Sequence, residues 1–122
     1  MAKKSADIDL PCIMMDTIVA LVRRDGPDLT SRQFGVFLIC YLRDTPQTVR
    51  GLAAEMKVSK PAITRVLDRL AEFKLIRRKA DPNDGRSMVV GRTLAGTTYL
   101  RDLRAIMSAA RQGWSGSHQP AG

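Results

Sequence analysis

The sequence has few of the residues that usually build metal or catalytic sites. Its single histidine, His118, stands in a Gly- and Ser-rich C-terminal stretch, and neither Cys12 nor Cys40 has a neighbour at the spacing of metal ligands. No Gly-rich phosphate loop, nucleophile motif or pair of carboxylates in an apolar frame is present. We therefore expect no metal, no cofactor and no enzymatic activity.

Long hydrophobic runs are also missing. A membrane-spanning helix needs roughly 20 apolar residues in a row, and no stretch of the chain approaches that length. The N-terminal residues lack the apolar segment and cleavage site of a signal peptide, so we predict a cytoplasmic protein that does not bind membranes. In a reducing compartment, the two cysteines are expected to act as small buried hydrophobes, with a redox-sensing thiol as the less favoured alternative.

Positive charge is what the sequence has in excess. Lysine and arginine number 20 against 12 acidic residues, which gives a net charge of +8 and an isoelectric point near 10.2. Residues 49–92 contain 11 of the basic residues and 5 of the acidic ones, so most of the excess lies in the middle of the chain. This favours an anionic partner, most often a nucleic acid, although a solubilising surface would also account for it.

Helical signals follow one another along most of the chain, with capping residues, apolar stripes and helix-stopping Gly or Pro residues at the boundaries. They predict a first helix over Leu10–Arg24, a buried helix between a Thr30–Gln33 capping box and Asp44, a short helix from Thr48 to Met56, a helix capped by Ser59, and a last helix over Thr93–Arg111. Residues 10–111 are expected to form one domain between flexible tails of residues 1–9 and 112–122. In the second tail, Trp114 either docks on the surface or anchors a partner.

Two short strands are predicted between the last two helices, at Leu75–Lys79 and Ser87–Arg92. The segment between them, ADPNDGR, is rich in turn-forming residues, and Asp84-Gly85 is a strong signal for a hairpin turn. The predicted fold class is therefore mainly α-helical with a small two-stranded β wing.

The short helix, the three-residue break after it and the helix capped by Ser59 have the layout of a helix-turn-helix. One face of the second helix carries the apolar residues Ile63, Val66, Leu67 and Leu70. The opposite face carries Lys60, Thr64, Arg65 and Arg69. Because a DNA major groove about 12 Å wide admits one helix, this second face is predicted to contact base edges and phosphates.

The ordered set of motifs resembles the MarR (multiple antibiotic resistance regulator) family of winged-helix transcription factors. The matching motifs are Leu29-Thr30-x-x-Gln33, Leu52-Ala53, VSKPAITRVLDRL, Leu75-Ile76-x-Arg78, DPNDGR and Thr93-x-x-Gly96. The resemblance implies that the helix after Ser59 reads the major groove, that Arg86 at the wing tip enters the minor groove, and that Asp84 steadies the wing through an ion pair. It also implies a homodimer held by the first and last helices.

The residue patterns and the resemblance together give two sets of candidate site residues. The predicted DNA contacts are Ser59, Lys60, Pro61, Thr64, Arg65, Arg69, Arg78, Asp84 and Arg86. The predicted dimer contacts are Leu10, Met14, Ile18, Leu21, Leu103 and Ile106. The first-helix stripe could instead pack on its own domain, but a helix of about 15 residues is marginal alone, which favours a partner copy.

Three residues depart from the family pattern. Lys74 replaces the glycine that is usual after the recognition helix, Arg92 places a charge where the family has a core leucine, and Gly85 replaces a common basic residue at the wing tip. A left-handed backbone at Lys74 would cost on the order of 1 kcal/mol.

These observations predict a homodimeric regulator of transcription that binds double-stranded DNA at specific sequences. The alternative is a winged-helix module that binds a protein partner, as an assembly or anti-repressor factor, without specific DNA binding. No residue pattern in the sequence supports a small-molecule effector, and the sequence leaves open whether one exists.

Overall fold

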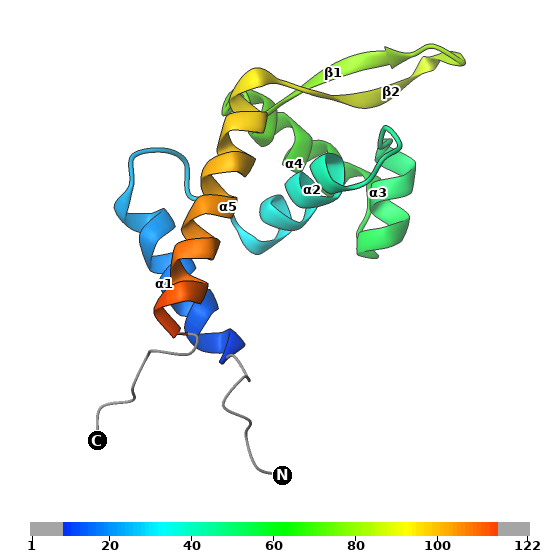
Figure 1. Ribbon diagram of the computed structural model, residues 1–122. Helices are drawn as coiled ribbons and strands as arrows, with labels where there is room; N and C mark the ends of the chain where they lie inside the picture. Colours follow the sequence, from blue (N-terminus) through cyan, green and yellow to red (C-terminus); the bar gives the residue numbers. More distant parts are fainter. Residues whose placement is uncertain (1–8, 115–122) are drawn as a thin grey trace. The chain divides into compact units, whose positions relative to one another are not determined.

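The computed structural model describes residues 9–114, apart from the side chains of Arg86 and Ser87. Its helices and strands are α1 (Leu10–Arg23), α2 (Ser31–Leu42), α3 (Val49–Met56), α4 (Lys60–Glu72), β1 (Ile76–Asp81), β2 (Asp84–Arg92) and α5 (Leu94–Trp114) (Figure 1). They fall into two compact units. Residues 29–100 form the larger unit, and the described residues 9–28 with 101–114 form the other, so that α5 contributes to both. This order of elements is that of a winged helix, as the sequence predicted.

Side-chain caps begin the helices of the larger unit where the sequence placed them. The Thr30 hydroxyl accepts a hydrogen bond from the Gln33 N–H at 3.1 Å, and the Gln33 side chain accepts one from the Thr30 N–H at 2.9 Å. Thr48 and Ser59 cap α3 and α4 through their hydroxyl oxygens. Each cap satisfies backbone N–H groups that have no partner within the helix, so these local patterns fix the helix starts.

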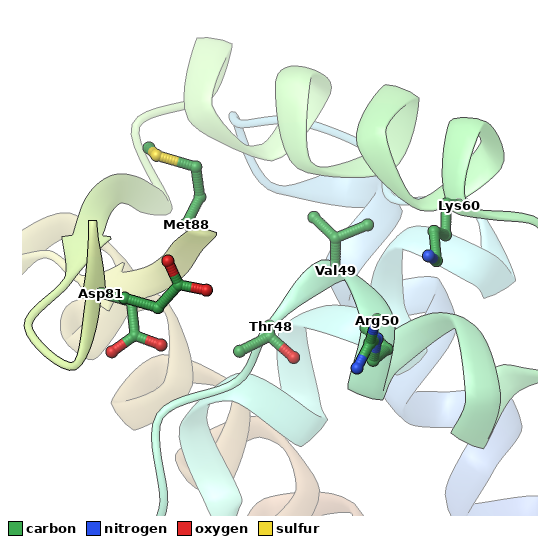
Figure 2. Close-up of a pocket in the computed structure, with 7 residues that line it drawn as sticks. Thr48, Val49, Arg50, Lys60, Asp81 and Met88 are labelled. Carbon is green, nitrogen blue, oxygen red and sulfur yellow. The ribbon is translucent and has the colours of Figure 1, made fainter. Parts of the chain in front are cut away.

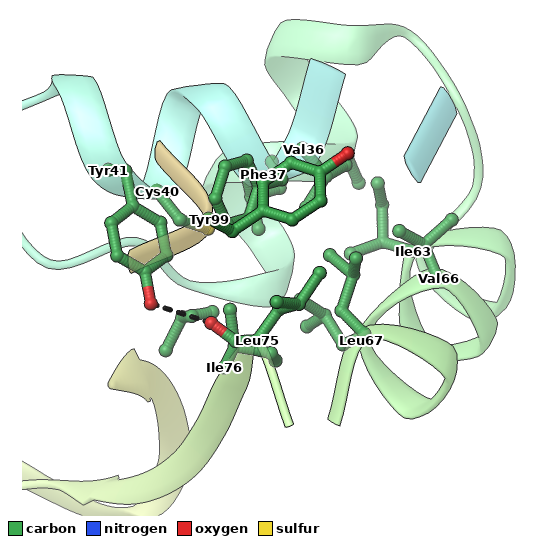
Figure 3. Close-up of a cluster of buried hydrophobic side chains, with 14 residues drawn as sticks. Val36, Phe37, Cys40, Tyr41, Ile63, Val66, Leu67, Leu75, Ile76 and Tyr99 are labelled. Atoms are coloured by element: carbon green, nitrogen blue, oxygen red, sulfur yellow. Dashed lines mark hydrogen bonds between the residues drawn. The ribbon is translucent and has the colours of Figure 1, made fainter. Parts of the chain in front are cut away.

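The core of the larger unit is formed by the inner faces of its helices and by the root of the wing (Figure 3). From α2 and α5 it contains a group of aromatic rings: Phe37 stacks on Tyr41 with centroids 4.5 Å apart and meets Tyr99 edge-on at 5.2 Å. From α4 it contains the predicted stripe Ile63, Val66, Leu67 and Leu70. These buried side chains hold α4 by one face and leave its other face outside the core.

The Tyr41 hydroxyl joins three segments that are far apart in the sequence. It donates to the Leu75 carbonyl at 2.6 Å (Figure 3). It also accepts from the Thr93 N–H at 3.0 Å, just before α5. Gly96 in the first turn of α5 allows this approach, since a Cβ atom there would lie 1.8 Å from the Tyr41 oxygen. One hydroxyl therefore fixes the end of α2, the start of the wing and the start of α5 together.

The backbone turns left-handed at Lys74, directly after α4, with φ of 64°. The Lys74 N–H donates to the Ala71 carbonyl and the Leu75 N–H donates to the Leu70 carbonyl, both at 2.9 Å, which closes the helix end. Glycine adopts this conformation without a steric penalty, whereas a lysine pays on the order of 1 kcal/mol. The replacement of the family's glycine has thus left the turn in place.

The wing is an antiparallel pair of strands that are longer than predicted. Its turn is at Pro82-Asn83, with Asp81 paired to Asp84, and the predicted turn at Asp84-Gly85 was wrong. The Asp81 carboxylate accepts from the Asn83 N–H at 2.9 Å, and Pro82 presets the backbone for the turn. The register shifts between Ala80 and Asp81, so residues 85–87, where the Asp-Gly signal falls, lie in an irregular part of β2.

Two backbone contacts attach the wing to the segment before α3. The Val90 N–H donates to the Gln47 carbonyl at 2.8 Å, and Thr48 forms an isolated antiparallel bridge with Val89. Both valines are buried. The wing is therefore anchored at its root, on the side where α3 begins.

Arg92 is exposed rather than placed in the core, although the family has an apolar residue there. Its guanidinium donates to the carbonyls of Cys40 at 3.1 Å and Arg43 at 2.7 Å, and lies over the Tyr41 ring at 5.5 Å. The charge thus caps the C-terminal end of α2, where free carbonyls favour a cation.

In the smaller unit, α5 continues to Trp114, three residues beyond the end predicted at Arg111. The Trp114 indole N–H donates to the Asp16 carboxylate of α1, and Arg24 pairs with Asp102 at 3.4 Å. The tryptophan therefore docks on its own chain, which was one of the two expectations for it. The remaining predicted tails, residues 1–8 and 115–122 with His118, lie outside the described residues.

Both cysteines are free thiols, Cys40 buried in α2 and Cys12 half-buried in α1. Burial raises the pKa of Cys40 to about 12, despite the opposing charge of Arg92. A hydrogen bond with Asp9, then burial and the charges of Asp9 and Asp16, raise the pKa of Cys12. Both thiols are protonated at neutral pH, which makes them poor nucleophiles.

Candidate nucleic-acid interface

Helix α4 has one face in the core and one in solvent. Five of its residues are buried, namely Ala62, Ile63, Val66, Leu67 and Leu70. The residues between them are exposed, namely Lys60, Pro61, Thr64, Arg65, Asp68 and Arg69. The exposed set contains every residue of α4 that the sequence proposed for DNA contact.

Lys60, Thr64 and Arg65 form a free polar stripe at the N-terminal half of α4. Among the described residues, neither Lys60 nor Arg65 takes part in an ion pair or a side-chain hydrogen bond. The stripe begins at the N-terminal end of the helix, where the helix dipole favours an anion. It can therefore offer two positive charges and a hydroxyl to an outside partner.

Ser59 and Pro61 serve mainly to start this helix. The Ser59 hydroxyl oxygen accepts from the Ala62 N–H at 3.2 Å, which occupies one of its acceptor sites. Pro61 lies exposed in the first turn, where its missing N–H costs nothing. Both residues sit beside the free stripe, but their local roles are structural.

Arg69 and Arg78 are engaged within the chain. Arg69 pairs with Glu72 at 2.8 Å and its guanidinium lies 5.1 Å from the centre of the Phe73 ring. Arg78 of β1 pairs with Asp68 of α4 and also donates to the Thr64 carbonyl at 3.3 Å. The partners of Arg78 are non-local, so the basic patterning of the sequence could not separate it from the free arginines. The partners of Arg69 are local, since Glu72 and Phe73 follow it by three and four residues on the same helix.

The predicted wing residues lie at or near the tip of the hairpin. Asp84 is exposed and begins β2 opposite Asp81. The backbone of Arg86 lies in β2, but its side chain is outside the described residues. Its contact with the minor groove stays a prediction.

A cleft of about 540 Å³ separates the wing from the N-terminal ends of α3 and α4 (Figure 2). Arg50 and Lys60 lie on the helix side of this cleft, and Asp81 with Met88 lies on the wing side. Arg50 was not among the predicted contacts, although it belongs to the basic middle region of the sequence. Its position next to Lys60 follows from how α3 and α4 pack, which periodicity alone does not give.

The predicted dimer residues fall into three groups by exposure. Leu10, Met14 and Ile18 of α1 are 69%, 65% and 42% exposed, which is high for side chains of this kind. Leu21 and Ile106 are half-buried. Leu103 is only 4% exposed, so it is already covered by its own chain and is not available to a partner.

Residues 29–88, from the start of the larger unit to the second strand of the wing, match the model of the MarR family. This region of the chain belongs to the MarR family. The match covers α2, α3, α4 and most of the wing, and so includes the free stripe of α4. No curated protein sequence matches the chain significantly.

Solved structures of similar fold include several transcriptional regulators. A MarR-family regulator from Rhodococcus sp. RHA1 is 27% identical with a TM-score of 0.61, over 83% of this chain and 69% of that one. CouR from Rhodococcus jostii RHA1, solved with p-coumaroyl-CoA, is also 27% identical, with a TM-score of 0.63 over 88% and 73%. A mutant MepR from S. aureus, solved with an oligodeoxyribonucleotide, shares the fold at 22% identity and a TM-score of 0.67, over 81% and 69%.

In the described part of the chain, no helix has the length and apolar character that crossing a membrane requires.

Proposed function

We propose that the chain is a homodimeric regulator of transcription that binds double-stranded DNA at specific sequences. The observation that carries the proposal is the outer face of α4, where Lys60 and Arg65 are exposed without an ion-pair partner while the inner face is buried. Membership of the MarR family supports it, since relatives of this fold are transcriptional regulators.

In this proposal, α4 enters the major groove with its N-terminal half leading. The groove is about 12 Å wide and admits a helix, so Thr64 and Arg65 would reach base edges. An arginine can bind the O6 and N7 atoms of guanine with two hydrogen bonds, which makes Arg65 the main candidate for sequence reading. Lys60 and Arg50, on one side of the cleft, would bind phosphates and fix the helix on the duplex.

The wing would lie along the neighbouring minor groove, with Arg86 as the inserted side chain. Narrow minor grooves attract arginine through their negative potential. Asp84 would steady the wing rather than contact DNA, because a carboxylate repels phosphates.

The second copy would pack on the exposed apolar stripe of α1. Leu10, Met14, Ile18 and Val22 follow one another every four residues, and each is more than 40% exposed. A contiguous apolar surface of this kind marks a contact surface. Two copies would then place their α4 helices in successive major grooves, about 34 Å apart, on a near-palindromic site.

Selection of bound sites from a random duplex pool tests this proposal directly. We expect enrichment of a near-palindromic sequence whose half-sites are about 10 base pairs apart. An absence both of enrichment and of any gel retardation at low salt would overturn DNA binding. It would favour a winged helix that binds a protein partner.

Substitution of two arginines separates sequence reading from general affinity. Arg65→Ala should reduce the preference for the selected site over random duplex by about tenfold, since a bidentate contact to a base is lost. Arg86→Ala should weaken binding to both duplexes to a similar extent. Fluorescence anisotropy at one fixed salt concentration measures both effects, with Arg23→Ala, an exposed arginine of α1, as the control for loss of charge. Unchanged binding in both variants would contradict this assignment.

A further inference from the structure

Arg78 lies on the face of β1 that is turned toward α4. Side chains of a strand alternate between its two faces, so Arg77 and Lys79 point the other way. Their aliphatic stems lie over Gly91 of β2, where a Cβ atom would be 2.6 Å from Lys79 and 3.0 Å from Arg77. Arg78 instead pairs with the Asp68 carboxylate and donates to the Thr64 carbonyl at 3.3 Å. One guanidinium therefore spans a full turn of the recognition helix.

Asp68 lies on the same outer face as the free stripe. It is four residues after Thr64 and three after Arg65, so it is a neighbour of both on the helix surface. Its side chain is 52% exposed even with Arg78 in place. A carboxylate at this position would repel the phosphates of any duplex that α4 approaches, unless a cation offsets its charge.

We propose that Arg78 is a positioning residue that neutralises Asp68 on the DNA-facing side of α4, and that it is not itself a DNA contact. This inference rests on the proposed function. A basic residue beside a recognition helix is usually expected to contact a DNA phosphate. Here the guanidinium already donates to two acceptors on the helix, the Asp68 carboxylate and the Thr64 carbonyl. Its positive charge is paired with a carboxylate of the same chain. Arg78 therefore affects DNA binding only by offsetting the charge of Asp68.

A double-mutant cycle distinguishes the two roles. Wild type, Arg78→Ala, Asp68→Ala and the double variant are compared for binding to the selected duplex and to random duplex, at several salt concentrations. Arg78→Ala should weaken binding about tenfold, because it leaves an uncompensated carboxylate against the phosphates. The double variant should return to within about threefold of wild type, because the carboxylate is removed as well. Asp68→Ala alone should bind random duplex more tightly and so discriminate less.

A direct phosphate contact predicts a different result. The double variant would then be as weak as Arg78→Ala, and the steepness of log affinity against log salt would fall by about 0.9 for each subunit of the dimer in both variants. A merely structural role also differs, because it would lower the melting temperature of Arg78→Ala with no recovery of binding in the double variant. Either result would overturn the inference.

Two controls complete the experiment. Arg77→Ala removes an equal charge from the opposite face of the same strand and should show no coupling to Asp68→Ala. Arg78→Gln, which keeps the polar stem, replaces Arg78→Ala if that variant unfolds. If wild type binds no duplex, the proposed function falls and this inference with it. If wild type binds and Arg78→Ala binds equally well, only the inference falls.

Discussion

Helices α1 and α4 begin in the same way, but the exposed side chains of α1 are largely apolar and those of α4 are mostly polar or charged. Each begins with a side-chain cap, Asp9 or Ser59, and each has a proline in its first turn. Each also buries some residues and leaves others exposed. The exposed residues of α4 are mostly charged or polar, whereas those of α1 include Leu10, Met14, Ile18 and Val22.

The difference indicates what each helix would bind. A charged stripe with unpaired cations is favourable beside a polyanion and unfavourable in a protein core, whereas an apolar stripe is favourable only where another apolar surface covers it. The two faces should therefore respond differently to salt and to acidic substitutions, and neither should respond to a backbone change at the end of α4.

The largest expected effect is that of salt. Raising the concentration from about 50 to 200 mM should weaken duplex binding about a thousandfold, because the dimer would neutralise several phosphates and release their counterions. Self-association through α1 should change little, since burial of apolar surface does not depend on counterions. Anisotropy with labelled duplex and sedimentation of the free protein measure the two equilibria. A similar loss in both would mean that the α1 surface is also electrostatic.

The next effect tests the apolar stripe. Met14→Asp combined with Ile18→Asp should raise the dissociation constant of the dimer about a hundredfold, because two carboxylates would have to be desolvated. Analytical ultracentrifugation over a concentration series measures this. Arg23→Asp introduces the same group at an exposed polar position of the same helix and should leave the dimer intact. A monomeric wild-type chain would remove the comparison altogether.

The smallest expected effect concerns the end of α4 and leaves both faces unchanged. Lys74→Gly should raise the free energy of unfolding by about 1 kcal/mol, because glycine adopts the left-handed conformation seen there without strain. Thermal unfolding should show a rise of about 4 °C in Tm. The relative affinity for selected and random duplex should stay the same. A lower Tm would show that the lysine stem contributes more than the backbone strain costs.

Local signals in the sequence were sufficient for most of the fold. The caps at Thr30 and Ser59 and the α4 stripe from Ile63 to Leu70 depend on residues three or four positions apart, and the structure has them as predicted. The wing turn was misplaced, because Asp84-Gly85 is a good turn sequence but Asp81-Pro82-Asn83 is another, and the pairing of the strands selects between them.

Partners far apart in the sequence account for what the sequence did not show. The composition could not reveal that Arg78 would be held by Asp68 or that Arg92 would cap α2, since each depends on how separate elements pack. The end of α5 was placed too early for a similar reason, because Trp114 meets Asp16 of the first helix. Leu103 lies on the apolar side of its helix and was therefore predicted to contact a partner copy. A single sequence does not distinguish a residue buried within its own chain, as Leu103 is, from one buried by a partner.

The close approach of Gly96 to Tyr41 has a consequence for genetics. Any side chain at position 96 would collide with the Tyr41 oxygen and with the Leu75 carbonyl, 2.3 Å from a Cβ atom there. If the chain regulates transcription as proposed, a screen for loss of regulation should recover substitutions at this glycine as well as at the proposed DNA contacts. Such alleles would be recessive and sensitive to growth temperature, because the altered chains would fail to accumulate rather than compete for the promoter.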